Sequence, residues 1–294
     1  MPNVHIVTDS CATFVNKQMT QQHPVTVVPS KVHIGGKIYR EGVDLSSDEL
    51  LNLIAQQGMP SQITPPTMDE FVQTYAEISK TADTIVSIHA SREIYPMWNR
   101  ARIAAQQITG HSQIDVIDTQ TLCAGQGMLV KVGLRAIEAG EDFDGIVRAV
   151  RGAVDRVYSM YYVEAVTPLL ENGIMSSSHT ILGTMLGVKP FLAIEEGRLV
   201  PVEKVQTRTQ ALEHLIDFAL EFEDLEDAVI VQYRTHPTEQ TRALRDRFAI
   251  EFPQQGFPHA VYGASFAALI GVEATGVVIL EKEDTDGFLN DDFD

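Results

Sequence analysis

Short runs of apolar, β-branched residues alternate with amphipathic segments along most of this chain, and this alternation restricts its possible folds more than any other feature. Each run is rich in Val and Ile and is too short for a helix. The runs that predict buried strands are Val4–Thr8, Thr84–Ile88, Ile114–Ile117, Ala228–Gln232 and Val277–Leu280. Between them, apolar residues recur at helical spacing, for example in Gly127–Ala139 and Thr209–Phe222. Strands and helices that alternate in this way are typical of an α/β protein.

The segment Val25–Tyr39 has a different pattern. Two alternating runs flank Pro29 and Ser30, and Gly35 and Gly36 mark a second turn. Alternation interrupted by close turns is typical of antiparallel strands. We therefore expect a small antiparallel excursion on an otherwise mostly parallel sheet.

The length of 294 residues is long for one domain and comfortable for two. A helical pattern over Phe143–Arg156 ends where a strand-like run, Val157–Val163, begins. We therefore predict an N-terminal α/β domain over residues 1–157 and a C-terminal α/β domain over 158–283. An acidic tail over 284–294 follows. The ligand pocket is expected at the sheet edge and the domain interface.

The formal net charge of −18 limits the possible partners. Nucleic-acid binding depends on Lys and Arg contacts to phosphates, so this class is disfavoured. No apolar run approaches the roughly 18 residues of a membrane span, so no stable membrane insertion is expected. Only Cys11 and Cys123 occur, which indicates a reducing compartment, and no basic and apolar leader opens the sequence. We therefore expect a cytoplasmic protein.

Motifs of catalysis are missing from the sequence. It contains no Gly-x-Ser-x-Gly elbow and no nucleotide-binding loop, and its nine histidines are scattered without metal-ligand spacing. The expectation is a protein without a catalytic centre, metal or cofactor of its own.

Small polar residues instead follow several predicted strands. Thr8-Asp9-Ser10, Ser91 and Asp118-Thr119 each come after a strand, and Gly125 opens the next helix. Ligands of open parallel sheets bind beyond the carboxyl ends of the strands, and helix N-termini there favour anionic groups. The same residue types also serve routinely as helix N-caps. Both interpretations, a binding site and a set of caps, remain open.

Several short motifs occur in a fixed order along the chain. They are Thr8-Asp9-Ser10, the stretch Val27–Leu50, Val116-Ile117-Asp118-Thr119, Gly125-Gln126-Gly127, Gly183, Leu186, Lys189-Pro190, Glu203-Lys204-Val205 and Thr207-Arg208. In their order and spacing the chain resembles the DegV family from end to end. The resemblance implies two α/β domains with a lipid tail buried between or beneath them.

The resemblance also implies a function. Characterised relatives bind a long-chain fatty acid and present its carboxylate to a separate kinase, which forms an acyl phosphate. For this chain it implies a carrier that binds a fatty acid or another amphiphile, with a fatty acid kinase subunit as a further partner. A related fold occurs in dihydroxyacetone kinases, so a small-ligand enzyme is a third hypothesis, which no motif supports.

The chain departs from the family at the head-group site. Ile94-Tyr95-Pro96-Met97 replaces a Leu-Ser-Gly-Thr segment whose serine contacts the carboxylate. Ile174 stands at an arginine position and Leu269 at a histidine position. An uncompensated buried carboxylate is costly and tends to become protonated. Either the head group is held differently, or the ligand is not an ordinary free fatty acid.

Candidate head-group ligands therefore come from hydroxyls and helix starts near these positions. Tyr95 could donate one hydrogen bond, although a packing role is an equally open interpretation. His89 and Ser176-Ser177-Ser178-His179 are further candidates. The predicted ligand-binding residues are Thr8, Asp9, Ser10, Ser61, Thr64, Ser91, Tyr95, Asp118, Thr119 and Gly125.

Overall fold

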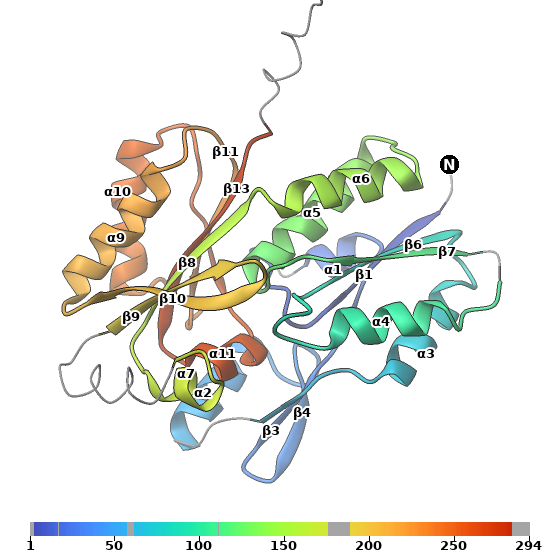
Figure 1. Cartoon of the computed structure of the whole chain (residues 1–294), viewed down its shortest axis with the longest axis horizontal. Helices are drawn as coiled ribbons and strands as arrows, with labels where there is room; N and C mark the ends of the chain where they lie inside the picture. The colour runs from blue at the N-terminus through green and yellow to red at the C-terminus, as the bar shows by residue number, and fades with distance from the viewer. Residues whose placement is uncertain (1–2, 17, 58–61, 111, 176–188, 284–294) are drawn as a thin grey trace, which may run out of the picture.

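The structure is a computed structural model that describes residues 3–16, 18–57, 62–110, 112–175 and 189–283. Its strands form three sheets (Figure 1). The first is parallel, with the order β2-β1-β6-β7. Its strands are β1 (Val4–Asp9), β2 (Val25–Val28), β6 (Thr84–His89) and β7 (Gln113–Asp118). The apolar runs predicted in this half of the chain are therefore confirmed as parallel strands; Val4–Thr8 and Thr84–Ile88 are buried, whereas Ile114–Ile117 lies on the edge strand and is mostly half-buried.

Helices cover both faces of the parallel sheet. Figure 1 shows α3 (Met68–Ile78) and α4 (Met97–Ala105) on one side, and α5 (Ala124–Glu138) and α6 (Phe143–Val154) on the other. The short α1 (Met19–Gln22) packs beside β2. This two-sided cover explains why the strands read as continuous apolar runs.

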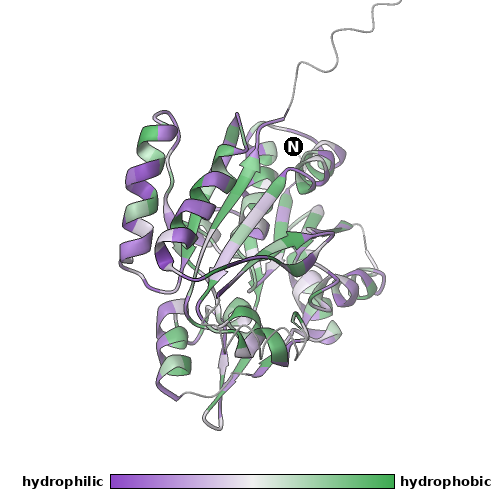
Figure 2. Ribbon diagram, turned by 60° about the vertical axis from the view of Figure 1, so that its left-hand side comes forward, coloured by the Kyte–Doolittle hydropathy of each residue, from purple (hydrophilic) through white to green (hydrophobic). Residues whose placement is uncertain are grey.

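The second sheet has six strands in the order β10-β9-β8-β13-β11-β12. It is antiparallel except for the pairing of β11 with β12. Its strands are β8 (Val157–Val163), β9 (Lys189–Glu195), β10 (Arg198–Val205), β11 (Leu225–Gln232), β12 (His259–Val261) and β13 (Ala274–Glu281). The helices α9 (Arg208–Leu220) and α10 (Glu239–Glu251) cover it, and Figure 2 shows that they alternate hydrophobic with hydrophilic residues. Helix α9 confirms the pattern predicted over Thr209–Phe222, and Thr207 and Thr238 cap the two helices.

Helix α5 lies between the two large sheets and contacts strands of both. It is buried on nearly all sides from Ala124 to Leu134, as expected of a helix without a solvent face. Gly127 permits the close approach of the chain, because a Cβ atom there would lie 2.1 Å from the carbonyl oxygen of Thr13. The largest hydrophobic core includes residues of both large sheets. The sheets therefore share packing, and the division at residue 157 stays a prediction.

The predicted antiparallel excursion is present and forms a small sheet of its own. Strands β3 (Lys31–Ile34), β4 (Lys37–Arg40) and β5 (Gln62–Thr64) pair in the order β4-β3-β5. The β3–β4 turn contains Gly35 and Gly36 at φ 56° and 77°, the positive values that tight hairpins require. Helices α2 (Ser47–Gln57), α7 (Thr167–Glu171) and α11 (Ala264–Ile270) lie at this end of the molecule (Figure 1). Among the described helices, none combines the length and apolar character that crossing a bilayer requires.

Candidate functional site

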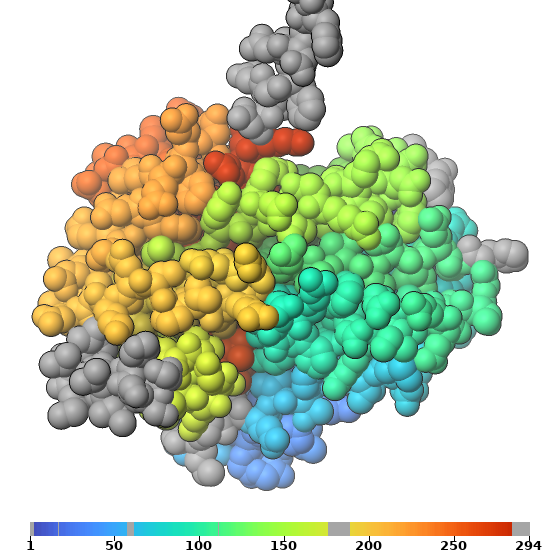
Figure 3. Space-filling view, in the orientation of Figure 1, coloured from blue at the N-terminus to red at the C-terminus, as the bar shows by residue number. Residues whose placement is uncertain are grey.

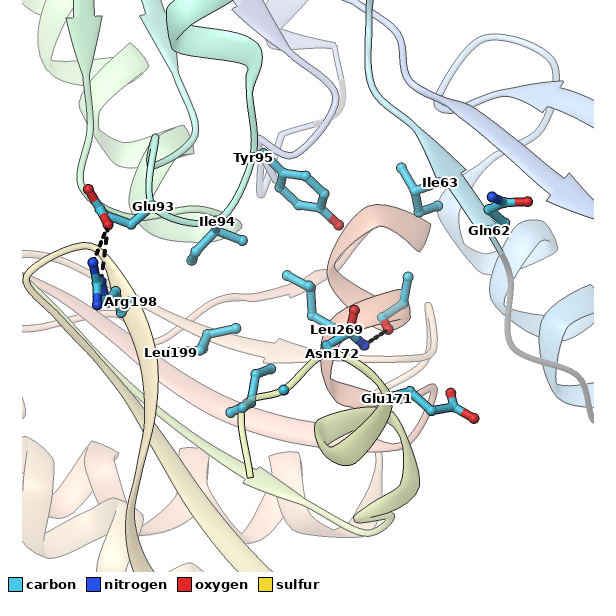
Figure 4. Close-up of a pocket in the computed structure, with 13 residues that line it drawn as sticks. Gln62, Ile63, Glu93, Ile94, Tyr95, Glu171, Asn172, Arg198, Leu199 and Leu269 are labelled. Carbon is cyan, nitrogen blue, oxygen red and sulfur yellow. Dashed lines mark hydrogen bonds and ion pairs between the residues drawn. The ribbon is translucent and has the colours of Figure 1, made fainter. Parts of the chain in front are cut away.

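A pocket of about 660 Å³ opens where segments of all three sheets approach one another (Figure 4). Its volume lies within the range of ligand sites, about 300–1,000 Å³. The lining combines β5, the segment after β6, the end of α7, the start of β10 and α11, and so includes both predicted domains. The lining residues are Gln62, Ile63, Glu93, Ile94, Tyr95, Glu171, Asn172, Gly173, Ile174, Arg198, Leu199, Ala268 and Leu269.

The apolar part of the lining comes from five separate segments of the chain. Ile63, Ile94, Ile174, Leu199 and Leu269 contribute aliphatic side chains. Ile174 and Leu269, the two departures from the family at charged positions, therefore both face the same cavity. A lining of this kind favours the hydrocarbon part of a ligand.

Tyr95 lines the pocket with its ring and is only 9% exposed. Its hydroxyl donates a 2.7 Å hydrogen bond to the carbonyl oxygen of Ser265, at the start of α11. Burial, together with the nearby Cys11, Glu41 and Asp9, raises the pKa of this phenol well above its ordinary value. The Tyr95 hydroxyl therefore keeps its proton and donates a hydrogen bond to the Ser265 carbonyl oxygen. This hydrogen bond connects the segment after β6 to α11.

An ion pair lies at the rim of the pocket. Arg198 Nη2 lies 2.6 Å from Glu93 Oε2 (Figure 4). This hydrogen bond with Arg198 lowers the pKa of the Glu93 carboxyl. Arg92 contacts the same carboxylate at 3.6 Å, lies 3.4 Å from Asp118 and stacks over Trp98. These contacts place the positive charges of the rim next to negative ones.

Asp9 is fully buried and does not line the pocket. His89 Nδ1 lies 2.9 Å from Asp9 Oδ2, and the backbone N–H groups of Cys11 and Ala90 donate to the carboxylate. Burial alone would raise the pKa of Asp9, but the hydrogen bond and charge of His89 and the N–H donors outweigh it, so the pKa is lowered. His89 Nε2 continues to Ser87 Oγ at 2.7 Å, and Ser87 to the Tyr75 hydroxyl at 2.8 Å. This arrangement forms a buried polar chain inside the parallel sheet's core.

Ser10 contacts Glu41, a buried carboxylate that the sequence analysis missed. Its hydroxyl donates to Glu41 Oε2 at 2.8 Å, and Glu41 also accepts hydrogen bonds from the N–H and hydroxyl of Ser265. Glu41 is 2% exposed. Burial raises the pKa of its carboxyl, and the Ser265 and Ser10 donors offset only part of this effect. The only sequence signal was its place between Tyr39 and Gly42, inside the stretch that carried the family resemblance.

The remaining predicted residues hold the loops at the sheet edge. Thr8 donates to the Ile88 carbonyl, Thr119 to that of His89, and Asp118 accepts the N–H groups of Arg92 and Gln120. Gly125 is closely packed, because a Cβ atom there would lie 2.6 Å from Thr121 Oγ1.

Two predicted hydroxyls have protein partners near the pocket. Ser91 donates to the Gly197 carbonyl, and Thr64 Oγ1 lies 2.9 Å from His33 Nε2. Ser61 and Ser176–His179 lie outside the described residues. Of the predicted ligand-binding set, Tyr95 is thus the described member that lines the pocket, and a binding role stays a prediction for Tyr95 as for the others. Cys11 and Cys123 are buried free thiols.

The arrangement defines a mixed apolar and polar ligand pocket between α/β layers. Within the described part of the chain, no group of three or more His, Cys, Asp or Glu side chains could hold a metal ion. The family model described as "Uncharacterised protein, DegV family" matches residues 3–282. The chain belongs to the DegV family.

Relatives and solved structures agree with this assignment. A DegV domain-containing protein of Streptomyces coelicolor is 29% identical over 282 residues, which cover 95% of this chain and 99% of the relative. The fatty acid binding DegV family protein from Streptococcus agalactiae superposes with a TM-score of 0.85 at 23% identity, covering 96% and 100%. The Streptococcus pneumoniae Fatty Acid Kinase (Fak) B3 protein, loaded with linoleic acid, gives 0.83 at 16% identity, covering 95% and 100%. The α/β fold is therefore shared with these proteins.

Proposed function

We propose that this protein binds one long-chain fatty acid or related amphiphile in the pocket between its sheets, and that it acts as a carrier rather than an enzyme. The observation that carries the proposal is the pocket itself, with its aliphatic lining from Ile63, Ile94, Ile174, Leu199 and Leu269. The family of this protein also supports the proposal, since similar structures include a protein described as fatty acid binding and one loaded with linoleic acid. The bound lipid would be the sole ligand, without a cofactor.

The hydrocarbon tail supplies the driving force in this proposal. Each buried methylene contributes about 0.8 kcal/mol, so a chain of about 16 carbons offers a large gross gain before the costs of association. The polar groups of the rim would then set orientation more than affinity. The two buried free thiols support a reducing, cytoplasmic setting for this binding.

A second candidate function is presentation of the bound lipid to a separate fatty acid kinase subunit. The similarity to the Fatty Acid Kinase (Fak) B3 protein favours it. In this version, the rim with Arg198 and Glu93 would face the partner, because it borders the pocket on the exposed side. Transfer of phosphate to the lipid on addition of a kinase subunit would support it.

The test is native mass spectrometry of the purified protein, followed by solvent extraction of what it carries. We expect a stoichiometric lipid adduct. The variant Ile174→Trp should lose it, because the larger ring occupies the pocket. Ile250→Trp is the matched control, since Ile250 on α10 is 71% exposed and does not line the pocket. A wild-type protein that neither carries nor takes up lipid would refute the proposal.

A further inference from the structure

The described side chains that line the pocket carry more negative than positive charge. Glu93 and Glu171 supply two carboxylates, and Arg198 supplies one guanidinium. No described residue pairs with Glu171. The segments 58–61 and 176–188, next to lining residues along the chain, contain no Lys or Arg.

The single lining guanidinium is already engaged. Arg198 Nε and Nη2 lie 3.1 and 2.6 Å from Glu93 Oε2. An incoming carboxylate would have to share this guanidinium with Glu93 through its remaining N–H groups, and it would place a third negative charge at the pocket. The shared contact gains little, since Arg198 is 69% exposed and its pairing is weakened by solvent. The described lining therefore offers an anionic head group no positive charge that is not already paired.

Two further hydrogen-bond donors of the described lining are committed to protein carbonyls. Asn172 Nδ2 donates to the carbonyl oxygens of Pro168 and Ala268, both at 2.8 Å. Tyr95 gives its proton to the Ser265 carbonyl oxygen. Apart from the outer N–H groups of Arg198, what remains in the described lining is a set of acceptors, namely Asn172 Oδ1, the second lone pair of Tyr95 and the Glu171 carboxylate. Gln62, which is exposed at the rim, can act either way.

We infer that the pocket selects an amphiphile whose head group is uncharged and donates hydrogen bonds, such as a long-chain alcohol or monoacylglycerol, over an ionised fatty acid. This inference rests on the proposed lipid-binding function and specifies its head group. A hydroxyl can donate to the free acceptors, whereas a carboxylate faces carboxylates and loses its hydration without compensation. The apolar side chains Ile174 and Leu269 strengthen this discrimination, because they lower the polarity around the head group.

The experiment compares oleyl alcohol with oleate on protein stripped of co-purified lipid. Each lipid is titrated into protein that carries Nile red, an uncharged fluorophore, and the displacement of Nile red is measured. The titration is done at about pH 8, where oleate is ionised. We expect oleyl alcohol to bind about tenfold more tightly than oleate, which is about 1.4 kcal/mol. Ile174→Arg should tighten oleate binding by about fivefold and leave the alcohol within about twofold, because it adds a cation inside the pocket. Ile250→Arg makes the same charge change on exposed α10 and should alter neither affinity.

The outcomes separate the two ideas. Oleate binding as tight as or tighter than that of the alcohol in the wild-type protein would overturn the inference and leave the lipid-binding function standing. An unchanged oleate affinity in Ile174→Arg, with the alcohol still bound, would also overturn it. If Nile red, oleate and oleyl alcohol all fail to bind, the proposed function fails, and the head-group inference fails with it.

Discussion

The Ser91 hydroxyl donates a 2.7 Å hydrogen bond to the carbonyl oxygen of Gly197. Ser91 follows β6 of the parallel sheet, and Gly197 lies in the turn between β9 and β10 of the six-stranded sheet. Figure 3 shows the yellow β9–β10 segment packed against the green segments of the first half of the chain. Because Arg198 follows Gly197 and pairs with Glu93, this contact positions one rim of the pocket.

Gly197→Ala should therefore destabilise the protein and weaken lipid binding. Gly197 has φ +80°, and a Cβ atom there would lie 2.5 Å from Ser91 Oγ. The strained backbone and the displaced hydroxyl should cost about 1–3 kcal/mol of the free energy of unfolding, measured by urea denaturation. Gly152→Ala on α6 is the control, because open space surrounds that site, and it should leave stability equal or slightly higher. Equal stability of Gly197→Ala and the wild type would contradict the argument.

Asp9→Asn should cost about 3 kcal/mol of unfolding free energy at neutral pH, because it breaks the buried pair with His89. The folded state lowers the pKa of Asp9, so the stabilisation by its charge is present above the unfolded pKa, about 3.9, and is lost as the pH falls through the folded pKa. The difference between wild type and variant should therefore shrink below about pH 4. Denaturant melts across this range measure it, with the exposed Asp246→Asn as the control. A difference independent of pH would argue against the ionic role of Asp9.

The strands and main helices were predictable because their signals are local. Val4–Asp9 and Thr84–His89 bury both faces between helices, so most of their residues are apolar and their buried polar side chains need protein partners. The sequence did not show which strands pair with one another or in which direction. The strands around Val32 and Tyr39 form a separate sheet with β5, and the antiparallel direction of β13 against β8 depends on contacts between distant segments.

The candidate site was predictable in location and less so in detail. Polar residues after β1, β6 and β7 do gather at one sheet edge, but Asp9, Ser91 and Thr119 bond to protein partners there. Glu41 escaped detection because its partner Ser265 is 224 residues away in the sequence. A buried carboxylate with such partners resembles any exposed glutamate until the chain is folded.

Glu41→Ala and Glu41→Gln should differ in their effect on stability. Alanine leaves the donors of Ser10 and Ser265 without an acceptor, which should cost about 2–3 kcal/mol. Glutamine keeps an oxygen for the Ser265 N–H and should cost about 1 kcal/mol or less.

The pH dependence of the Glu41 variants tests the same carboxyl. The folded state raises the pKa of Glu41, so the wild type holds this proton more tightly than the unfolded chain and loses stability as the pH rises from about 4.3 through the folded pKa. Glu41→Gln should therefore gain on the wild type over this window in thermal melts. Parallel curves for the two proteins would exclude the raised pKa.

Two variants of Tyr95 should separate the role of its ring from that of its hydroxyl. Tyr95→Phe keeps the pocket wall and leaves the Ser265 carbonyl without its donor, so it should cost about 1–2 kcal/mol of unfolding free energy. It should weaken oleyl alcohol binding only modestly, because it removes one acceptor of the pocket while Asn172 and Glu171 remain. Tyr95→Ala removes a buried ring and should cost about 3–5 kcal/mol, while it enlarges the pocket. The affinities for alcohols of increasing chain length are then measured in the wild type and both variants. The chain length that binds most tightly should increase in Tyr95→Ala only. The same optimum in all three proteins would show that this ring does not limit the length of the bound chain.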